Sequence, residues 1–148
     1  MSNTANIAQQ TATNRAIALR YAEEGWGTNP QWQQVWDELL ANNVVQHFAS
    51  EPQPIIGLAA NKQFNTELFQ GFPDITQTID HIVAEGNKVA YTATLQGTHQ
   101  GPFMGVSPTG KAIRISESFN LLRIDGDKIV ELWYQLNLLR VMQEIGAI

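Results

Sequence analysis

Glu117 is the side chain whose surroundings in the sequence most favour acid–base chemistry. It alternates with Ile115, Phe119 and Leu121, so an extended backbone would place one carboxylate on an otherwise apolar strand face. Burial there would raise the pKa of the carboxyl group towards the range of a useful general base. Alternatively, the residue lies near a strand edge with its carboxylate in water, and the pattern leaves both interpretations open.

Histidine is the other residue type that could carry a proton near neutral pH. His99 lies in the segment Gly-Thr-His-Gln-Gly, where it could act as an acid or base, or bond a backbone carbonyl. His47 follows a short β-rich run and could orient a substrate oxygen or make a structural hydrogen bond. His81 has apolar neighbours and fits a core or interface histidine best. Their spacing is not that of a helical or clustered metal site, so we expect no metal ion.

One face of the last expected strand, residues 128–137, gathers four side chains that carry polar groups. They are Glu131, Trp133, Gln135 and Asn137, and strand alternation puts all four on the same side. Such a face would suit the lining of a pocket, to which Tyr91 from an earlier strand could add a wall. The alternatives are a solvated face with the tryptophan at its edge, and a plain core position for the tyrosine.

The first half of the chain has the apolar spacing of helices. Asn29 and Pro30 are typical of a helix start, and the clearest helical face follows them. That face consists of Trp32, Val35, Trp36, Leu39 and Leu40. Weaker helical patterns cover residues 14–24 and 57–69.

The second half alternates like strands joined by tight turns. The expected strands are residues 44–48, 75–85, 88–98, 111–124 and 128–137, followed by a short helix at 138–145. Helices followed by hairpin-connected strands indicate an α+β domain, with helices on one side of an antiparallel sheet. Long strands with glycine-marked bends tend to curl, so we expect a cone-shaped sheet packed against the N-terminal helices, with a pocket at its open end.

Length and composition limit the function classes further. A chain of 148 residues fits one domain, which we place at residues 13–148 after a flexible polar lead at residues 1–12. The net charge is -5 without a basic stripe, so we expect no nucleic-acid binding. The chain lacks cysteine, which excludes disulfides and thiol nucleophiles. It also lacks a secretory signal and a long apolar run, so we expect a cytoplasmic protein without membrane association.

A series of short motifs runs along almost the whole chain. The motifs are Glu38-Leu39-Leu40-Ala41, Val45-Gln46-His47, Phe72-Pro73-Asp74, Gly97-Thr98-His99-Gln100-Gly101, Pro108-Thr109-Gly110 and Met142-Gln143-Glu144-Ile145-Gly146. In this order they resemble the SnoaL-like polyketide cyclases and ester cyclases of the nuclear transport factor 2-like superfamily. The resemblance implies a cone-shaped fold, commonly a homodimer, and a pocket for an apolar, oxygenated small molecule. It implies neither a metal nor an organic cofactor.

The chain departs from the resembled family at the position that matters most for proton transfer. The family's cyclases place an aspartate four residues after the tryptophan of the last strand, and this chain has Asn137 there. An asparagine can orient a group or donate a hydrogen bond, but it cannot accept the proton. Ester cyclases often have an acid directly after the tryptophan as well, where this chain has Tyr134.

Two functional hypotheses follow. In the first, the protein is a cofactor-independent cyclase or isomerase acting on a hydrophobic carbonyl compound, with Glu117 or His99 as acid or base. Asn137 and His47 would then hold substrate oxygens. Trp133, Tyr91 and Gln135 would line the pocket. In the second hypothesis, the same cone binds a ligand or only dimerises, without turnover.

Overall fold

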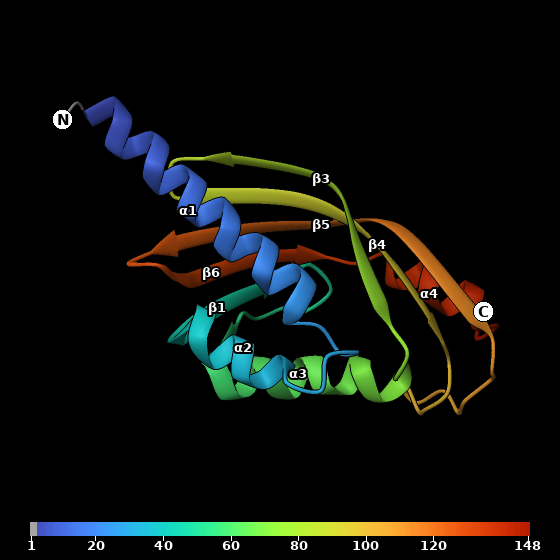
Figure 1. Ribbon diagram of the computed structural model, residues 1–148. Helices are drawn as coiled ribbons and strands as arrows, with labels where there is room; N and C mark the ends of the chain where they lie inside the picture. Colours follow the sequence, from blue (N-terminus) through green and yellow to red (C-terminus); the bar gives the residue numbers. More distant parts are fainter. Residues whose placement is uncertain (1–2) are drawn as a thin grey trace.

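The computed structural model describes residues 3–148, which form four helices and one six-stranded sheet (Figure 1). The helices are α1 (Asn3–Glu24), α2 (Trp32–Leu39), α3 (Leu58–Gly71) and α4 (Leu138–Glu144). The strands are β1 (Leu40–Phe48), β2 (Ile55–Ile56), β3 (Thr76–Glu85), β4 (Lys88–Thr98), β5 (Ala112–Asp125) and β6 (Lys128–Gln135). Most helices therefore precede the long strands, as the sequence pattern predicted.

The sheet has the strand order β2-β1-β6-β5-β4-β3. Neighbouring strands are antiparallel except for β1 and β6, which run parallel. The predicted α+β class and curled sheet are confirmed, but the sheet is mixed rather than purely antiparallel. The parallel pair is possible because β6 returns beside β1 only after the chain has passed through β2, α3 and three further strands.

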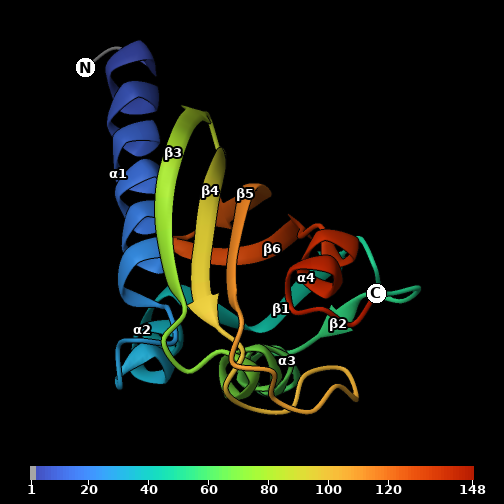
Figure 2. The ribbon, with the colours of Figure 1, turned by 90° about the vertical axis from the view of Figure 1, so that its right-hand side faces the viewer.

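Bulges make the sheet curl around the helices. Register shifts occur between Ile79 and His81 in β3, and between Ala93 and Leu95 where β4 pairs with β5. Near the second shift Glu117 has φ 62°, a left-handed conformation that bends β5 sharply. Figure 2 shows β3, β4 and β5 curving down to α3, with α1 lying alongside β3. The face of the sheet that the first three helices cover is called the inner face below.

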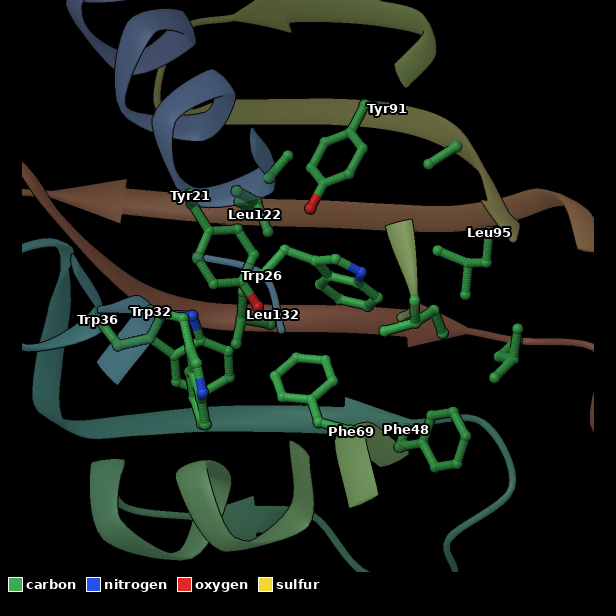
Figure 3. Packing of buried hydrophobic residues seen from close by; sticks show 14 of the residues in the cluster. Tyr21, Trp26, Trp32, Trp36, Phe48, Phe69, Tyr91, Leu95, Leu122 and Leu132 are labelled. Carbon is green, nitrogen blue, oxygen red and sulfur yellow. The ribbon is translucent and has the colours of Figure 1, made fainter. Parts of the chain in front are cut away.

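An aromatic cluster fixes the first three helices on the inner face (Figure 3). Trp26, in the loop after α1, packs edge-to-face on Phe69 of α3, with ring centroids 5.1 Å apart. Trp32 makes the same kind of contact with Phe69 at 5.1 Å and with Trp36 at 5.0 Å. Each such pair adds about 0.5–1.5 kcal/mol beyond the burial of its area. The indole of Trp36 also donates to the Gly25 carbonyl at 2.9 Å, which ties α2 to the end of α1.

Helix α1 begins earlier than the helical pattern at residues 14–24 predicted. Residues 3–12, which were expected to form a flexible lead, are the first turns of α1. Residues 1–2 lie outside the part of the chain that the structure describes. Most of the side chains in these first turns of α1 face water, so their polar composition reflects a solvated helix. Further along α1, Asn14 is buried and donates to the Gly86 carbonyl at 3.0 Å, anchoring the helix to the β3–β4 turn. Within residues 3–148, no helix combines the length and apolarity needed to cross a membrane.

Candidate functional site

Between the inner face and the helices lies a cavity, which we call the outer chamber. Its volume is about 110 Å³. Most of its lining is apolar, and the apolar residues come from β1, α3, the loop before β5 and the segment after β6. They are Phe48, Phe64, Leu68, Phe103, Leu136 and Leu138. Exposed Glu51, Glu67 and Met104 also border the chamber and mark its mouth.

A much smaller and more polar space adjoins it, which we call the inner chamber. Its volume is about 10 Å³, room for about one water molecule or one ligand atom of similar size. Three residues, Trp26, Asn65 and Tyr134, line both chambers and so form the boundary between them. The other polar residues of the inner chamber are Tyr21, Gln46, Gln77, Tyr91 and Asn120. The cavity therefore changes from apolar near its mouth to polar at its deep end.

Strand register brings the polar side chains of the inner chamber together. Tyr91 on β4 lies opposite Asn120 on β5, and Asn120 lies opposite Tyr134 on β6. The three side chains thus form a row across neighbouring strands, because residues in register point to the same face. Figure 3 shows Tyr91 pointing from β4 towards Trp26 and Tyr21. Gln46 comes from β1, whose inward positions also include buried Phe48.

Several polar atoms at the deep end are buried without a partner. Within residues 3–148, Trp26 Nε1 and Gln46 Nε2 have no hydrogen-bond partner. The Tyr134 hydroxyl has no hydrogen bond of normal geometry either, but it interacts with the buried Ser118 hydroxyl. Leaving a buried donor unpaired costs about 1–3 kcal/mol of stability. Gln77, in contrast, is satisfied, because its amide donates to the Ala22 carbonyl at 2.8 Å. The unpaired groups therefore need an explanation in terms of what occupies the cavity.

The tyrosines of the inner chamber are protonated donors at neutral pH. Burial raises the pKa of Tyr134 to about 12, and its interaction with the Ser118 hydroxyl offsets this only in part. Burial also raises the pKa of Tyr21 and of Tyr91 above the ordinary value of a phenol. Among the described residues that line the inner chamber, none is a carboxylate or a histidine. The deep end can hence donate hydrogen bonds, but it offers no ordinary base.

Of the predicted pocket residues, Tyr91 lines the cavity, whereas Trp133, Gln135 and His47 do not. These three border a groove on the outer face of the sheet, together with Phe119 and others. Alternation along β6 was predicted correctly, but the inward face is the other one. Its residues are Leu132, Tyr134 and Leu136. The face with Glu131, Trp133 and Gln135 turns outward, because the chain buries its more apolar alternating positions.

A hydrogen-bonded network organises the predicted residues on the outer face. Nε2 of His47 lies 2.7 Å from Oε2 of Glu131, and Arg123 Nε donates to the other carboxylate oxygen at 3.1 Å. The hydrogen bond from His47 and the charge of Arg123 hold the pKa of Glu131 below its ordinary value. The His47 ring stacks on Trp133 with centroids 5.2 Å apart. His47 is thus held in place by contacts within the protein.

Asn137 and Glu117 meet in a second exterior groove, beyond the walls of both chambers. Asn137 is the N-cap of α4, and its Oδ1 accepts the backbone N–H of Arg140 at 3.1 Å. Glu117 is exposed at the bulge of β5. The bulge interrupts the alternation that placed Glu117 on one face with Ile115 and Phe119. In the structure Ile115 is buried and Phe119 is 52% exposed.

His99 is fully buried and organises the loop before β5. Its Nδ1 accepts the backbone N–H of Thr109 at 3.2 Å, and its backbone bonds both Gly110 and Lys111. Because Nδ1 accepts, the ring proton belongs on Nε2, an assignment that rests on the hydrogen-bond pattern. His99 does not line either chamber among the residues described. Exposed His81 lies on the outer side of the β3 bulge.

Some residues of the cavity gave only a weak signal in the sequence. Gln46 stands between Val45 and His47 in a β-rich run, and Asn65 lies four residues before buried Phe69 on α3. The sequence signal that could have identified both residues is an amide side chain at a position where the helix or strand pattern expects an apolar one. Trp26 follows Gly25 in a loop, where no periodicity applies. Within residues 3–148, no group of three or more acidic or histidine side chains is arranged to hold a metal ion.

Comparison with known proteins points to one family. The sequence model of the SnoaL-like polyketide cyclase family matches residues 16–145. No curated protein sequence matches the chain significantly. A crystal structure from Jannaschia sp. CCS1, assigned to the SnoaL-like polyketide cyclases, is 32% identical with a TM-score of 0.87, and the alignment covers 93% of this chain and 94% of that one.

Two Streptomyces structures are similar at lower identity. IdmH from Streptomyces antibioticus, assigned as a polyketide cyclase, is 26% identical with a TM-score of 0.76, over 90% of this chain and 98% of that one. AclR from Streptomyces galilaeus, assigned as a hydroxylase, is 26% identical with a TM-score of 0.77, and the alignment covers 93% of this chain and 83% of that one. The two assignments differ, so the shared fold does not by itself fix a reaction.

Proposed function

Because the chain belongs to the SnoaL-like polyketide cyclase family, we propose that its cone binds a small hydrophobic carbonyl compound. The observation that carries the proposal is the change of polarity along the cavity. The outer chamber is lined by aromatic and aliphatic side chains, which favour a hydrocarbon body. The inner chamber ends in tyrosine, amide and indole groups, which favour an oxygen atom at the leading end of the ligand.

The positions of the candidate acids and bases favour binding over turnover. Glu117 is exposed on the exterior, and His99 is buried behind the loop that it organises. Neither side chain lines the cavity among the described residues, so neither is placed to exchange a proton with a ligand there. A binding role without chemistry is therefore the function that the geometry supports best.

A second candidate function is cofactor-independent proton transfer of the cyclase or isomerase type. The observation that favours it is the pair of carboxylates, Glu51 and Glu67, at the mouth of the outer chamber. Hydrogen–deuterium exchange beside the carbonyl of a bound ketone, followed by NMR, separates the two functions. Exchange above the buffer rate that Glu51→Gln or Glu67→Gln abolishes supports proton transfer. Absence of exchange at saturating ketone supports binding alone.

A ligand panel tests the binding function itself. Thermal unfolding is measured with aromatic ketones, terpenoid ketones and fatty acyl methyl esters. A ligand at about 100 times its dissociation constant adds about 2.7 kcal/mol to the free energy of unfolding. We expect Leu138→Trp, at the cavity wall, to abolish the shift. Leu139→Trp is the matched control, because Leu139 is 61% exposed and does not line either chamber.

We also propose a homodimer formed through the outer face of the sheet. A groove of about 510 Å³ crosses this face between β1, β4, β5 and β6. Its apolar members include Leu121, Trp133 and Phe119, the last of which is 52% exposed. Exposed Val83, at 68%, extends the apolar surface onto β3 opposite Ala90. An exposed surface with apolar residues of this kind could pack against a second copy of itself about a two-fold axis.

A further inference from the structure

Three residues with polar groups line the inner chamber from separate elements, and two of these groups, Trp26 Nε1 and Gln46 Nε2, have no hydrogen-bond partner within residues 3–148. Trp26 lines the chamber from the loop after α1, Gln46 from β1, and Tyr134 from β6. Gln46 is 3% exposed and Trp26 is 8% exposed, so bulk water does not satisfy them. The chain thus places two donors without a partner, Trp26 Nε1 and Gln46 Nε2, on residues that line a space of about 10 Å³. The Tyr134 hydroxyl, which also interacts with the Ser118 hydroxyl, belongs to the same lining.

Packing fixes the positions of these groups. The Trp26 ring lies edge-to-face on Phe69, with centroids 5.1 Å apart. The Tyr134 ring stacks on Phe48, with centroids 5.4 Å apart. Gln46 lies on a strand that is paired on both sides, to β2 and to β6. Because the surrounding side chains restrict rotation, the groups cannot easily turn to find other partners.

The chemistry of the three groups limits what can occupy the space between them. An indole N–H and an amide NH2 only donate hydrogen bonds, and a tyrosine hydroxyl donates or accepts. The occupant must therefore accept hydrogen bonds, and the volume admits about one oxygen atom. A carboxylate has two oxygens and a charge, and none of the described residues that line the inner chamber is cationic.

We propose that the inner chamber is a subsite for one neutral carbonyl oxygen, held by Trp26, Gln46 and Tyr134. This inference rests on the proposed function and makes it more specific, because it assigns the ligand's chemical class and its direction of entry. A ketone, aldehyde or ester carbonyl enters first, and the hydrocarbon body remains in the outer chamber. A secondary alcohol serves as a comparison, because its oxygen can accept from the same donors but carries a proton of its own.

The test uses probes of one size that differ only at the oxygen. Dissociation constants are measured for acetophenone, ethylbenzene, the corresponding secondary alcohol, and benzoate. We expect acetophenone to bind the wild-type protein about tenfold more tightly than ethylbenzene. Gln46→Leu and Trp26→Phe should each bring that ratio towards one. Phe64→Leu, in the outer chamber, is the control and should weaken both probes while leaving the ratio unchanged.

Infrared spectroscopy provides a second readout that a purely structural role would not affect. We expect the carbonyl stretch of bound acetophenone to lie at lower wavenumber than in an apolar solvent. The wavenumber of this carbonyl stretch should rise again in Gln46→Leu and in Tyr134→Phe. The shift reports hydrogen bonds to the carbonyl directly, so it does not depend on how much each variant changes the stability of the fold.

The possible failures are distinguishable. One outcome is that acetophenone and ethylbenzene bind with equal affinity and that Leu138→Trp prevents the binding of both. This result would contradict the carbonyl subsite but would still support the proposed binding function. In that case the inner chamber holds only a water molecule. Tighter binding of benzoate than of acetophenone also overturns the subsite. Failure of every probe to bind the folded protein at millimolar concentration contradicts both the subsite and the binding function.

Discussion

Residue 134 contributes more to the cavity than residue 137, to which the family resemblance first drew attention. Tyr134 faces inward and lines both chambers, whereas Asn137 caps α4 on the exterior. The protonated phenol donates a hydrogen bond but does not act as a base at neutral pH. With a tyrosine at this position, the deep end can donate hydrogen bonds, and none of the described residues that line it offers a carboxylate to accept a proton.

Tyr134→Asp tests how dry the inner chamber is. Burial should raise the pKa of the new carboxyl above the ordinary value of about 3.9, so the folded state would bind more protons than the unfolded chain. The variant should be most stable below about pH 4 and lose stability as pH rises through the raised pKa. Chemical denaturation across this range measures the effect, with Tyr134→Asn as the neutral control. A stability difference between the two variants that does not change with pH would indicate a hydrated chamber.

Glu131 should show the opposite pH dependence. His47 and Arg123 hold its pKa below the ordinary value of a glutamate, so its stabilising contribution is present above about pH 4.3. That contribution is lost as pH falls through the lowered pKa. Thermal unfolding at acidic pH should therefore be less pH-dependent in Glu131→Gln than in the wild type. The exposed Glu85→Gln serves as control, and an equal effect of both substitutions would contradict the role of the network.

At the scale of elements, the bulge in β5 decides which residues enter the cavity. The left-handed conformation of Glu117 costs about 1–2 kcal/mol for a side chain with a Cβ atom. Glu117→Gly should leave the free energy of unfolding unchanged or raise it, whereas the β-branched Glu117→Val should lower it by about 1–2 kcal/mol. Urea denaturation measures both. The neighbouring Ser116→Val is the control. An equal change in the free energy of unfolding for valine at 116 and at 117 would contradict a left-handed conformation at Glu117.

Most elements could be predicted from the sequence, because helical and strand periodicities are local properties. The faces of the strands could not, since a bulge shifts the alternation in mid-strand. Ile79 points inward, but after the β3 register shift His81 and Val83 lie on the outer face. The start of α1 was also missed, because its exposed first turns lack an apolar stripe. Sequence patterns therefore predict where elements lie better than which side chains they bury.

At the scale of the whole molecule, the cavity could not be predicted residue by residue. Trp26, Gln46, Asn65 and Tyr134 come from four elements or loops far apart in the chain, and only the curled sheet brings them together. A local pattern marks the type of an element but not its distant neighbours. The family resemblance supplied the expectation of a pocket, and the structure places Tyr91 in it but His47, Trp133 and Gln135 on the opposite face.

The proposed homodimer is also a property of the whole molecule. Phe119→Glu should convert the protein to a monomer in sedimentation velocity, because it places a charge among the apolar residues of the outer groove. Leu139→Glu, at an exposed position on α4, should leave the association state unchanged. A wild-type protein that sediments as a monomer at high micromolar concentration would contradict the dimer. The proposal that a ligand binds inside the cone does not depend on that result.

The most direct test of the central claim is a crystal structure of the protein with bound acetophenone. The account predicts that the phenyl ring lies in the outer chamber and that the carbonyl oxygen lies within hydrogen-bonding distance of Trp26 Nε1 and Gln46 Nε2. The opposite orientation, with the oxygen towards Glu51 and Glu67, would contradict the carbonyl subsite. Density for the ketone only in the groove beside Trp133, with the cone empty, would contradict the account as a whole.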